Sequence, residues 1–146
     1  MPYIRVWVHF VWSTKNRIPY LSDPIRPIIF DHIRENAAKK NIFLDEVNGY
    51  VDHVHCLVSL KQTQTIAQVA KLLKGESSRW VNKNQLCSTR MSWQKEYYAV
   101  SVGERGIKRL RKYIRNQEAH HRRQSFDREI QELEEKHGLV RFIEPH

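Results

Sequence analysis

Two histidines, His53 and His55, interrupt an otherwise apolar, strand-like segment at residues 49–60, GYVDHVHCLVSL. Residues two apart on a β-strand point to the same face of the sheet, so we expect the two imidazole rings to project side by side. That spacing suits one metal ion, but two imidazoles leave the coordination shell incomplete and require a further protein ligand. The alternative is that both rings occupy the more polar face of an amphipathic strand.

A second pair, Tyr113 and Gln117, lies on a basic segment whose apolar residues recur at helical spacing from residue 107 onward. This pattern predicts an amphipathic helix that begins near Glu104. Four residues make about 400° of helix rotation, so the phenol and the amide can reach a common point. A carboxamide oxygen can ligate a hard cation while the neighbouring hydroxyl stays free to attack. Alternatively, Tyr113 is a core aromatic residue and Gln117 lies at the core boundary.

The chemistry of a phenol explains why a metal would be needed beside Tyr113. At the ordinary phenol pKa of about 10, only about 0.1% is phenolate at neutral pH, so unassisted attack on a phosphodiester is slow. A divalent cation can contact a non-bridging phosphate oxygen and orient the scissile bond. Nitrogen ligands favour Mn²⁺, whereas cellular abundance favours Mg²⁺. The four residues together predict a metal-assisted tyrosine nucleophile for DNA.

The chain is strongly basic, with 25 Lys and Arg residues against 16 Asp and Glu residues, a net charge of +9 and a pI of about 9.8. Basic side chains concentrate in residues 103–123, where the only acids are Glu104 and Glu118. Neutralised phosphates release counterions, so we expect binding to nucleic acid that weakens steeply with salt. The alternative is a merely solvated helix face. The candidate phosphate contacts are Arg105, Lys108, Arg109, Arg111, Lys112, Arg115, Arg122 and Arg123.

Five segments give the chain a family resemblance that spans nearly its whole length. They are VHFVWSTKNR at 8–17, DHVHCLV at 52–58, LKGESSRW at 73–80, WQKEYYAVSV at 93–102 and YIRNQEAHH at 113–121. In this order they resemble the single-tyrosine HUH-type transposases, an insertion-sequence family that moves as single-stranded DNA and includes relatives associated with repetitive extragenic palindromes.

The resemblance implies a role for each residue of the two pairs. His53 and His55 would hold the divalent metal, Gln117 would complete the protein ligands, and Tyr113 would be the nucleophile. The implied activity is cleavage and rejoining of single-stranded DNA with hairpin or palindromic ends through a 5′-phosphotyrosine intermediate, because the retained ester can be reversed by a 3′-hydroxyl without ATP. One nucleophile per chain predicts a homodimer. The resemblance further suggests that the Tyr113 helix of one subunit completes the histidine site of the other, although the sequence itself leaves open which subunit donates.

Two other classes of function are compatible with the sequence. One is a non-catalytic nucleic-acid-binding module in which the basic helix binds RNA and the histidines are incidental. The other is a metal-dependent phosphodiesterase in which water attacks and Tyr113 is structural.

Three polar residues near the two pairs are candidates for supporting roles. Asp52, next to His53, could accept a hydrogen bond from a histidine ring, or it could only close the turn before the strand. His120 and His121 could orient phosphate or supplement the metal ligands, or they could lie at a solvated helix end.

A further candidate DNA surface lies on the helix predicted after residue 65, where Lys71, Lys74 and Ser78 share one face. The alternative is that this face points only to solvent. Gly75 within the helix costs about 1 kcal/mol relative to Ala, which a close backbone neighbour would explain. Aromatic residues that could stack on bases, if they lie outside the core, are Trp12, Tyr20 and Trp93.

Strand-like and helix-like segments alternate in the order βαββαβ. This order predicts an α+β sandwich of the ferredoxin or RNA-recognition-motif type: an antiparallel sheet with helices on one face, followed by the tyrosine helix and a short C-terminal helix. The predicted elements are a strand at 3–12, a helix opened by Asp23 and Pro24 that stops near 41, strands at 42–50 and 51–60 around a turn at Asn48 and Gly49, a helix that starts at the capping box of Thr65 and Gln68, and a strand at 97–102.

A chain of 146 residues normally makes one domain. We expect residues 1–124 to form the catalytic domain and 125–146 a helical tail of the same domain, with Ser125 as N-cap and Gly138 as the stop. This acidic tail could be a dimer or docking element, or a solvated capping helix. No apolar run approaches the ~18 residues of a membrane span and no secretion signal is recognisable, so we expect no membrane partner and a cytoplasmic, nucleoid-associated protein.

Overall fold

The computed structural model describes residues 2–121 and 123–137. Within these residues, no helix is both long and apolar enough to span a membrane. The elements are β1 (Val6–Ser13), the 3-10 turn η1 (Lys15–Arg17), α1 (Ile25–Lys39), β2 (Phe43–Tyr50), β3 (His53–Leu60), α2 (Ile66–Lys83), β4 (Tyr98–Val102), the 3-10 turn η2 (Glu104–Gly106), α3 (Ile107–Arg115), α4 (Gln117–His121) and α5 (Phe126–His137).

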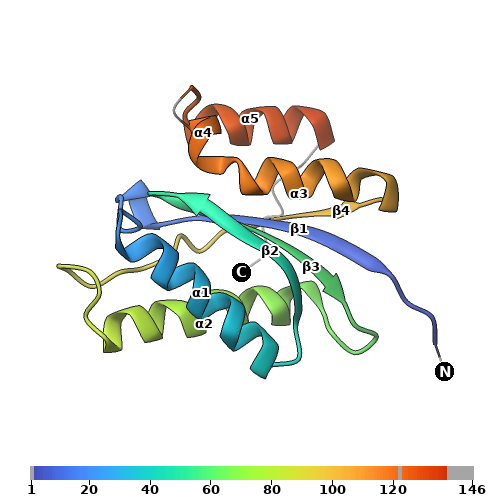
Figure 1. Ribbon diagram of the computed structural model, residues 1–146, viewed down its shortest axis with the longest axis horizontal. Coiled ribbons are helices and arrows are strands. Elements are labelled where there is room, and N and C mark those ends of the chain that lie inside the picture. Colours follow the sequence, from blue (N-terminus) through green and yellow to red (C-terminus); the bar gives the residue numbers. More distant parts are fainter. Residues whose placement is uncertain (1, 122, 138–146) are drawn as a thin grey trace, which may run out of the picture.

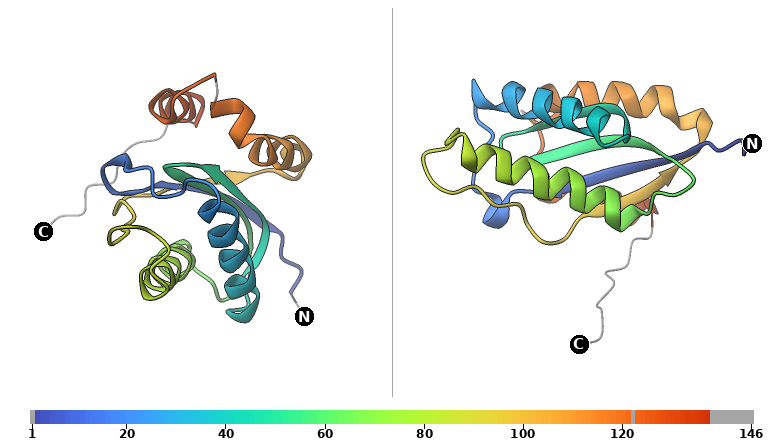
Figure 2. Two further views of the ribbon diagram at one scale, coloured as in Figure 1. Left: turned by 60° about the vertical axis from the view of Figure 1, so that its left-hand side comes forward. Right: turned by 90° about the horizontal axis from the view of Figure 1, so that it is seen from below.

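The four strands form one antiparallel sheet in the order β2-β3-β1-β4, which confirms the predicted α+β class. Helices α1 and α2 cover one face of the sheet, and α3, α4 and α5 lie over the other (Figure 1). Figure 2 shows the same layers from two further sides, with α1 and α2 next to each other on one side of the sheet. The predicted capping box at the start of α2 is also present, because the side chains and backbones of Thr65 and Gln68 bond reciprocally.

The main hydrophobic core lies between the sheet and the helices α1 and α2. The strands supply one side of this core, including Phe10 and Cys56, which are both fully buried. These residues alternate along the strands with residues that face the opposite side of the sheet. Ile29, Ile33 and Leu73 supply the helical side. Trp12 and Trp93 also belong to this core and contact each other edge to face, so neither is free to stack on bases. Tyr20 packs against the same cluster.

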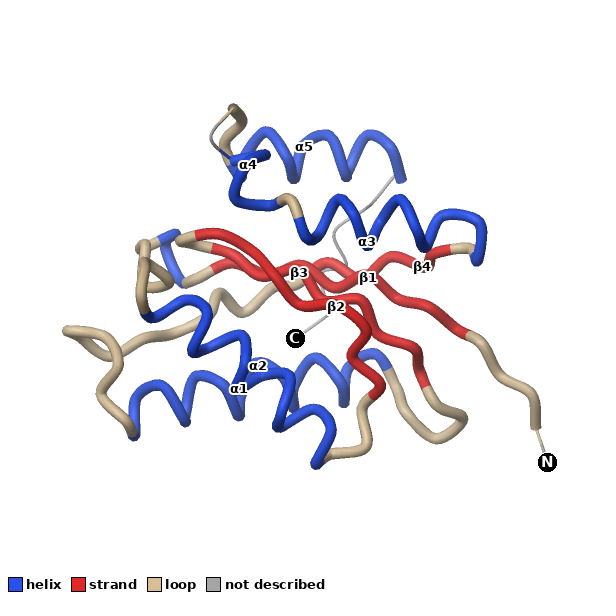
Figure 3. The backbone as a smooth tube through the Cα atoms, in the orientation of Figure 1, coloured by secondary structure: helices blue, strands red, loops and turns tan. Residues whose placement is uncertain are grey.

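Helices α3 and α5 each have a smaller apolar contact with the opposite face of the sheet. Ile107 and Ile114 of α3 pack with Trp7 and Leu57. Phe126 and Ile130 of α5 pack with Val11. These two clusters hold the helices over β1 and β3, the second of which carries the histidine pair (Figure 3).

The turn between β2 and β3 falls at Val51 and Asp52, so its prediction at Asn48 and Gly49 was wrong. Gly49 lies within β2 opposite Val54. A Cβ on Gly49 would lie 2.0 Å from the carbonyl oxygen of His53. The glycine is therefore required by a close backbone approach beside the first histidine, and not by a turn.

The basic amphipathic helix that we predicted to begin near Glu104 is interrupted at Asn116, which separates α3 from α4. The side-chain amide of Asn48 donates hydrogen bonds to the carbonyl oxygens of Ile114 at 3.0 Å and Arg115 at 3.1 Å. Carbonyls in the last turn of a helix lack helical partners, so a β2 side chain satisfies the end of α3.

Gly75 has nothing within 4 Å of the position that a Cβ would take. The close backbone neighbour suggested by the sequence is therefore absent at this position.

On the other side of the sheet, Ser125 accepts a hydrogen bond from the backbone of Arg128 at 3.3 Å, as expected for a residue that caps α5. Gly138, the predicted helix stop, lies outside the described residues.

Candidate active site

The two histidines project from β3 into the layer between the sheet and the helices α3–α5, and both are fully buried. Their ring centroids are 5.2 Å apart. The side-by-side placement predicted from their spacing is therefore present. Buried imidazoles must be held by hydrogen bonds or by a ligand, so their partners decide what this cluster can do.

His53 has an oxygen atom facing each of its two ring nitrogens. Asp52 Oδ1 lies 2.8 Å from Nδ1, and Gln117 Oε1 lies 2.9 Å from Nε2. A neutral imidazole carries one N–H group and can donate to only one of them. With a cation at the Nε2 side, Nδ1 can donate to Asp52 while Nε2 and the Gln117 oxygen both become ligands. The donor set around His53 therefore fits a divalent metal.

His55 is held by a histidine that the sequence analysis did not single out. His9, on the neighbouring strand β1, places Nε2 2.8 Å from Nδ1 of His55, and the two rings stack. Burial and the neighbouring His55 ring lower the pKa of His9 to about 3. Burial also lowers the pKa of His55 to about 4, although Glu129 partly opposes this shift. His9 and His55 are therefore neutral at pH 7, as metal ligation requires.

Glu129 of α5 joins this cluster, although we expected the acidic tail to be a docking element or a solvated helix. Its side chain is only 2% exposed, and Oε1 lies 2.9 Å from His55 Nε2. Burial alone would raise the pKa of this carboxyl, but hydrogen bonds from His121 and His55 hold its pKa well below its usual range. The signal that was missed is spacing, because residue 129 falls on the inward stripe formed by Phe126 and Leu133.

Tyr113 reaches the same carboxylate from α3, because its hydroxyl donates a hydrogen bond to Glu129 Oε2. The tyrosine ring centroid is 5.7 Å from that of His55 in the same chain. Gln117, fully buried at the start of α4, also donates to Glu129 Oε2, at 3.4 Å. Tyr113 and Gln117 thus reach a common point despite the helix break between them. Burial and the Glu129 carboxylate raise the pKa of Tyr113, so this arrangement favours the neutral hydroxyl.

His120 and His121 lie on the outer side of Glu129, with Nε2 atoms 3.1 Å and 3.2 Å from its Oε2. His121 also bonds through Nδ1 to the carbonyl oxygen of Gln124 at 2.8 Å. Burial lowers the pKa of His120. Neither histidine lies at a solvated helix end, since both contact the polar cluster that contains Tyr113.

A pocket of about 430 Å³ opens beside the nucleophile candidate, and basic residues from α3 and the segment after α4 line it. His120 forms part of the wall next to Tyr113. Cationic side chains in a pocket next to a hydroxyl suit a phosphate group. The basic residues that line it are Arg109, Lys112 and Arg123.

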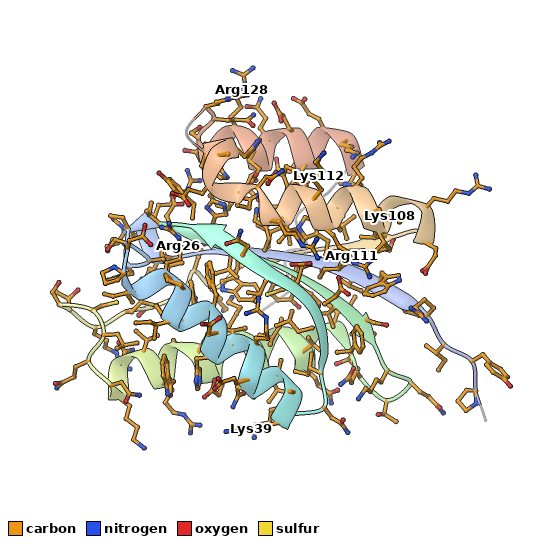
Figure 4. All side chains as sticks on the ribbon, viewed as in Figure 1. Arg26, Lys39, Lys108, Arg111, Lys112 and Arg128 are labelled. Carbon is orange, nitrogen blue, oxygen red and sulfur yellow. The ribbon has the colours of Figure 1, made fainter. Side chains whose placement is uncertain are left out.

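Other basic residues of α3 have different surroundings (Figure 4). Arg111 donates two hydrogen bonds to Asp45 of β2, at 2.7 Å and 3.1 Å, and Arg115 donates one to Glu46 at 2.7 Å. These two guanidinium groups fasten α3 to β2, and their contact with DNA stays a prediction. Arg105 and Lys108 are exposed, and Arg122 lies outside the described residues.

A second basic surface lies on the far side of the sheet, along α2. Lys71, Lys74 and Ser78 share one wall of a groove of about 1020 Å³, as their helical spacing predicted. The Lys74 ammonium donates to the backbone carbonyls of Gln94 at 2.7 Å and Lys95 at 2.9 Å, and burial lowers its pKa to about 8. Further basic residues lining the groove are Arg79, Lys83, Arg90 and Lys95.

Comparison with known proteins shows which family the chain matches. The family described as "Transposase IS200 like" matches residues 3–117 of the chain. The chain belongs to the IS200-like transposase family. This membership makes it a transposase, and a DNA-cleaving enzyme by class, and confirms the resemblance found in the sequence. Residues 118–137, which include α5 and Glu129, lie beyond the matched range.

Individual relatives of this IS200-like transposase agree with the family. The ISDra2 transposase TnpA of Deinococcus radiodurans is 29% identical over 115 residues, covering 75% of this chain and 81% of the relative. The crystal structure of a candidate transposase from the same organism superposes with a TM-score of 0.65 at 25% identity, over 80% of this chain and 93% of that one. A REP-associated tyrosine transposase, solved with a REP hairpin bound, shares the fold with a TM-score of 0.61 at 14% identity, over 83% of this chain and 72% of that one.

Proposed function

We propose that this transposase cleaves and rejoins single-stranded DNA with Tyr113 as the nucleophile, and that it recognises hairpin or palindromic ends. The observation that carries the proposal is the meeting of the Tyr113 hydroxyl, the two β3 histidines and Gln117 in one buried polar cluster. A tyrosine that only filled the core would not need to share a carboxylate, Glu129, with His55 and Gln117.

In the proposed reaction the Tyr113 oxygen loses its proton and forms a bond to the scissile phosphorus. The bond from phosphorus to the 3′ oxygen breaks, and that oxygen takes up a proton to become the free 3′-hydroxyl. The 5′-phosphotyrosine ester keeps the energy of the original bond, so a 3′-hydroxyl of another strand can run the step in reverse. Cleavage and joining are then one reaction in two directions.

His53, His55 and Gln117 would hold the divalent cation, Mg²⁺ or Mn²⁺, which supplies charge neutralisation at the phosphate. Asp52 would keep the Nδ1 proton on His53 and leave Nε2 free for ligation, as the 2.8 Å contact between them favours. His120, Arg109, Lys112 and Arg123 would bind the scissile phosphate in the pocket beside Tyr113, and His121 would support Glu129 from the other side.

The rest of the basic surface is proposed to bind DNA away from the reacting phosphate. Arg105 and Lys108 would extend the track along α3, and Lys71 and Lys74 would contact DNA in the groove on the other face of the sheet. We further propose that two chains act together, because excision of an element requires both of its ends to be cleaved. Residues 1–124 would form the catalytic domain, with 125–146 as a tail that belongs to the same domain.

A covalent-adduct assay tests the proposal. The purified chain is incubated with 5′-labelled and 3′-labelled single-stranded hairpin DNA and Mn²⁺, then separated under denaturing conditions. The wild type should form a denaturation-resistant protein–DNA species that retains the strand 3′ of the cut, and Tyr113→Phe should abolish it while DNA affinity stays within about twofold. Tyr3→Phe, which alters an almost fully exposed tyrosine, is the matched control and should leave the adduct unchanged.

Two results would overturn the proposal. Cleaved DNA without an adduct in Tyr113→Phe would show that water attacks and that the protein is a phosphodiesterase. Tight DNA binding with no cleavage by the wild type, in either metal, would show a non-catalytic binding module.

A further inference from the structure

Glu129 is the one carboxylate within the described residues that lies between the histidine pair and the nucleophile candidate. It comes from α5, beyond the residues that match the family. Resting on the function proposed above, we propose that Glu129 is a direct ligand of the divalent cation, in addition to His53, His55 and Gln117.

The first support is the geometry of the potential ligand atoms. Oε1 of Glu129 lies 2.9 Å from Nε2 of His55 and 3.6 Å from Nε2 of His53. Around a cation with bonds of about 2.1 Å, neighbouring ligand atoms are roughly 3.0 Å apart in an octahedron and roughly 3.4 Å apart in a tetrahedron. The Gln117 oxygen, 2.9 Å from His53 Nε2, fits the same spacing. The ligand atoms of His53, His55 and Glu129 all lie within 4.8 Å of one another, close enough to face one ion.

The second support is charge. Two neutral imidazoles and a carboxamide bring no negative charge to the cation that they would hold. Mg²⁺ and Mn²⁺ bind best where carboxylate ligands contribute such charge. Glu129 would supply that charge from a position that is almost fully buried. An ionised carboxylate in such a place needs a cation or several donors to offset its lost hydration. Metal ligation meets this requirement.

The two oxygens of Glu129 also have different neighbours. Oε1 faces the β3 histidines, and Oε2 accepts the hydrogen bond from the Tyr113 hydroxyl. A second possible metal group, formed by Glu129 with His120 and His121, uses the Oε2 side. The His53–His55 side is favoured because Gln117 and Glu129 both present oxygens there and because both histidines are fully buried. The acidic helix α5 thereby becomes part of the active site.

Mn²⁺ binding to the full-length, metal-free chain tests the proposal without DNA or turnover. Isothermal titration calorimetry measures the affinity, and the electron paramagnetic resonance signal of free Mn²⁺ provides an independent count of bound ion. Glu129→Gln keeps the size and hydrogen-bonding capacity of the side chain but removes its charge. We expect this variant to bind Mn²⁺ at least about tenfold more weakly than the wild type.

Glu135→Gln is the matched control, because it removes a charge from an exposed position of the same helix. It should leave the Mn²⁺ affinity within about twofold of the wild type. His120→Gln should also leave Mn²⁺ bound, since His120 belongs only to the second group and its proposed phosphate contact plays no part in a titration without DNA. Loss of binding in that variant would place the ion in the second group and overturn the proposal.

Two outcomes for Glu129→Gln would overturn the proposal. Unchanged Mn²⁺ affinity would show that the carboxylate only holds the helix, and tighter binding would show that it obstructs the site. If the variant does not fold, wild-type crystals grown with Mn²⁺ decide the question. The anomalous peak should lie roughly 2.0–2.3 Å from a Glu129 oxygen, and a peak beyond bonding distance of both oxygens would refute direct ligation.

The test separates this inference from the proposed function. A wild type that binds Mn²⁺ through Glu129 but forms no adduct with DNA would leave the ligand assignment standing and reject the tyrosine mechanism. A wild type that forms the adduct, with a Mn²⁺ affinity that does not depend on Glu129, would support the tyrosine mechanism and reject Glu129 as a metal ligand.

Discussion

The two faces of the sheet differ in what they bury. Towards α1 and α2, strands β1 and β3 present apolar side chains such as Phe10, Val54 and Cys56, which form the main core. Towards α3–α5 the alternate residues include His9, His53 and His55, all buried and all bonded to other polar groups. Because successive side chains of a strand point to opposite faces of the sheet, the apolar residues pack on one face and the polar residues gather on the other.

This difference shows how a small domain accommodates a buried polar cluster. Burial of apolar surface is the dominant favourable term in folding, and the α1–α2 side provides most of it. The opposite side has only two small apolar clusters, around Ile114 and around Phe126, which position α3 and α5. The site can then be tuned for a ligand, because the stability of the fold comes mainly from elsewhere.

The largest expected effect on stability comes from the packing face. Phe10 is fully buried in the main core, so Phe10→Ala removes a large apolar side chain and leaves a cavity. We expect the free energy of unfolding to fall by about 3–5 kcal/mol, measured by urea denaturation of the metal-free protein. Below its unfolding transition the variant should still bind Mn²⁺ with an affinity within about threefold of the wild type. Loss of Mn²⁺ binding by the folded variant would show that the two faces are not separable.

A smaller effect is expected from the site face, at His9. Its Nε2 lies 2.8 Å from His55 Nδ1, so it orients a proposed metal ligand without reaching the ion itself. His9→Phe should weaken Mn²⁺ binding about 10–100-fold, which is the usual cost of losing such a partner, as measured by calorimetry. His9→Gln retains a hydrogen-bonding side chain and should recover part of the loss.

His32→Phe is the control for this change, because His32 stacks on Trp80 and bonds to Glu76 away from the site. It should leave the Mn²⁺ affinity unchanged. An equal loss in both variants, or none in His9→Phe, would contradict a positioning role for His9.

The parts of the molecule that the sequence predicted well are those governed by local patterns. Alternation along β3 placed His53 and His55 together, and the Thr65 capping box marked the start of α2. Tyr113 and Gln117 also meet at a common point, although the break at Asn116 places them in two helices. The first two outcomes need only the geometry of one strand or one helix.

The parts that were missed depend on contacts between distant segments. The side-chain amide of Asn48, on β2, donates hydrogen bonds to the last carbonyls of α3. Helical periodicity in the sequence does not reveal the break at Asn116 that follows. His9 bonds to His55 across 46 residues, and Glu129 reaches the same ring across 74. No local pattern distinguishes such a glutamate from its solvated neighbours, apart from its place on the inward stripe of α5.

The smallest expected effect concerns Gly75, within α2 on the packing side. Its Cβ position is open, and a glycine in a helix interior is less favourable than alanine by about 1 kcal/mol. Gly75→Ala should therefore raise the free energy of unfolding by about that amount, measured by urea denaturation, and should leave the Mn²⁺ affinity unchanged.

Gly49→Ala is the instructive contrast, because a Cβ there meets the His53 carbonyl oxygen at 2.0 Å. That variant should lose both stability and Mn²⁺ affinity, since β2 and β3 must separate beside the first histidine. A destabilised Gly75→Ala would contradict the prediction, because it would show that a Cβ at this position is not accommodated in open space. If Gly49→Ala kept full affinity for Mn²⁺, the backbone beside His53 would be free to move without disturbing the ligand. The two glycines thus test, with the same one-methyl change, an open position on the exposed side of α2 against the close β2–β3 approach beside His53.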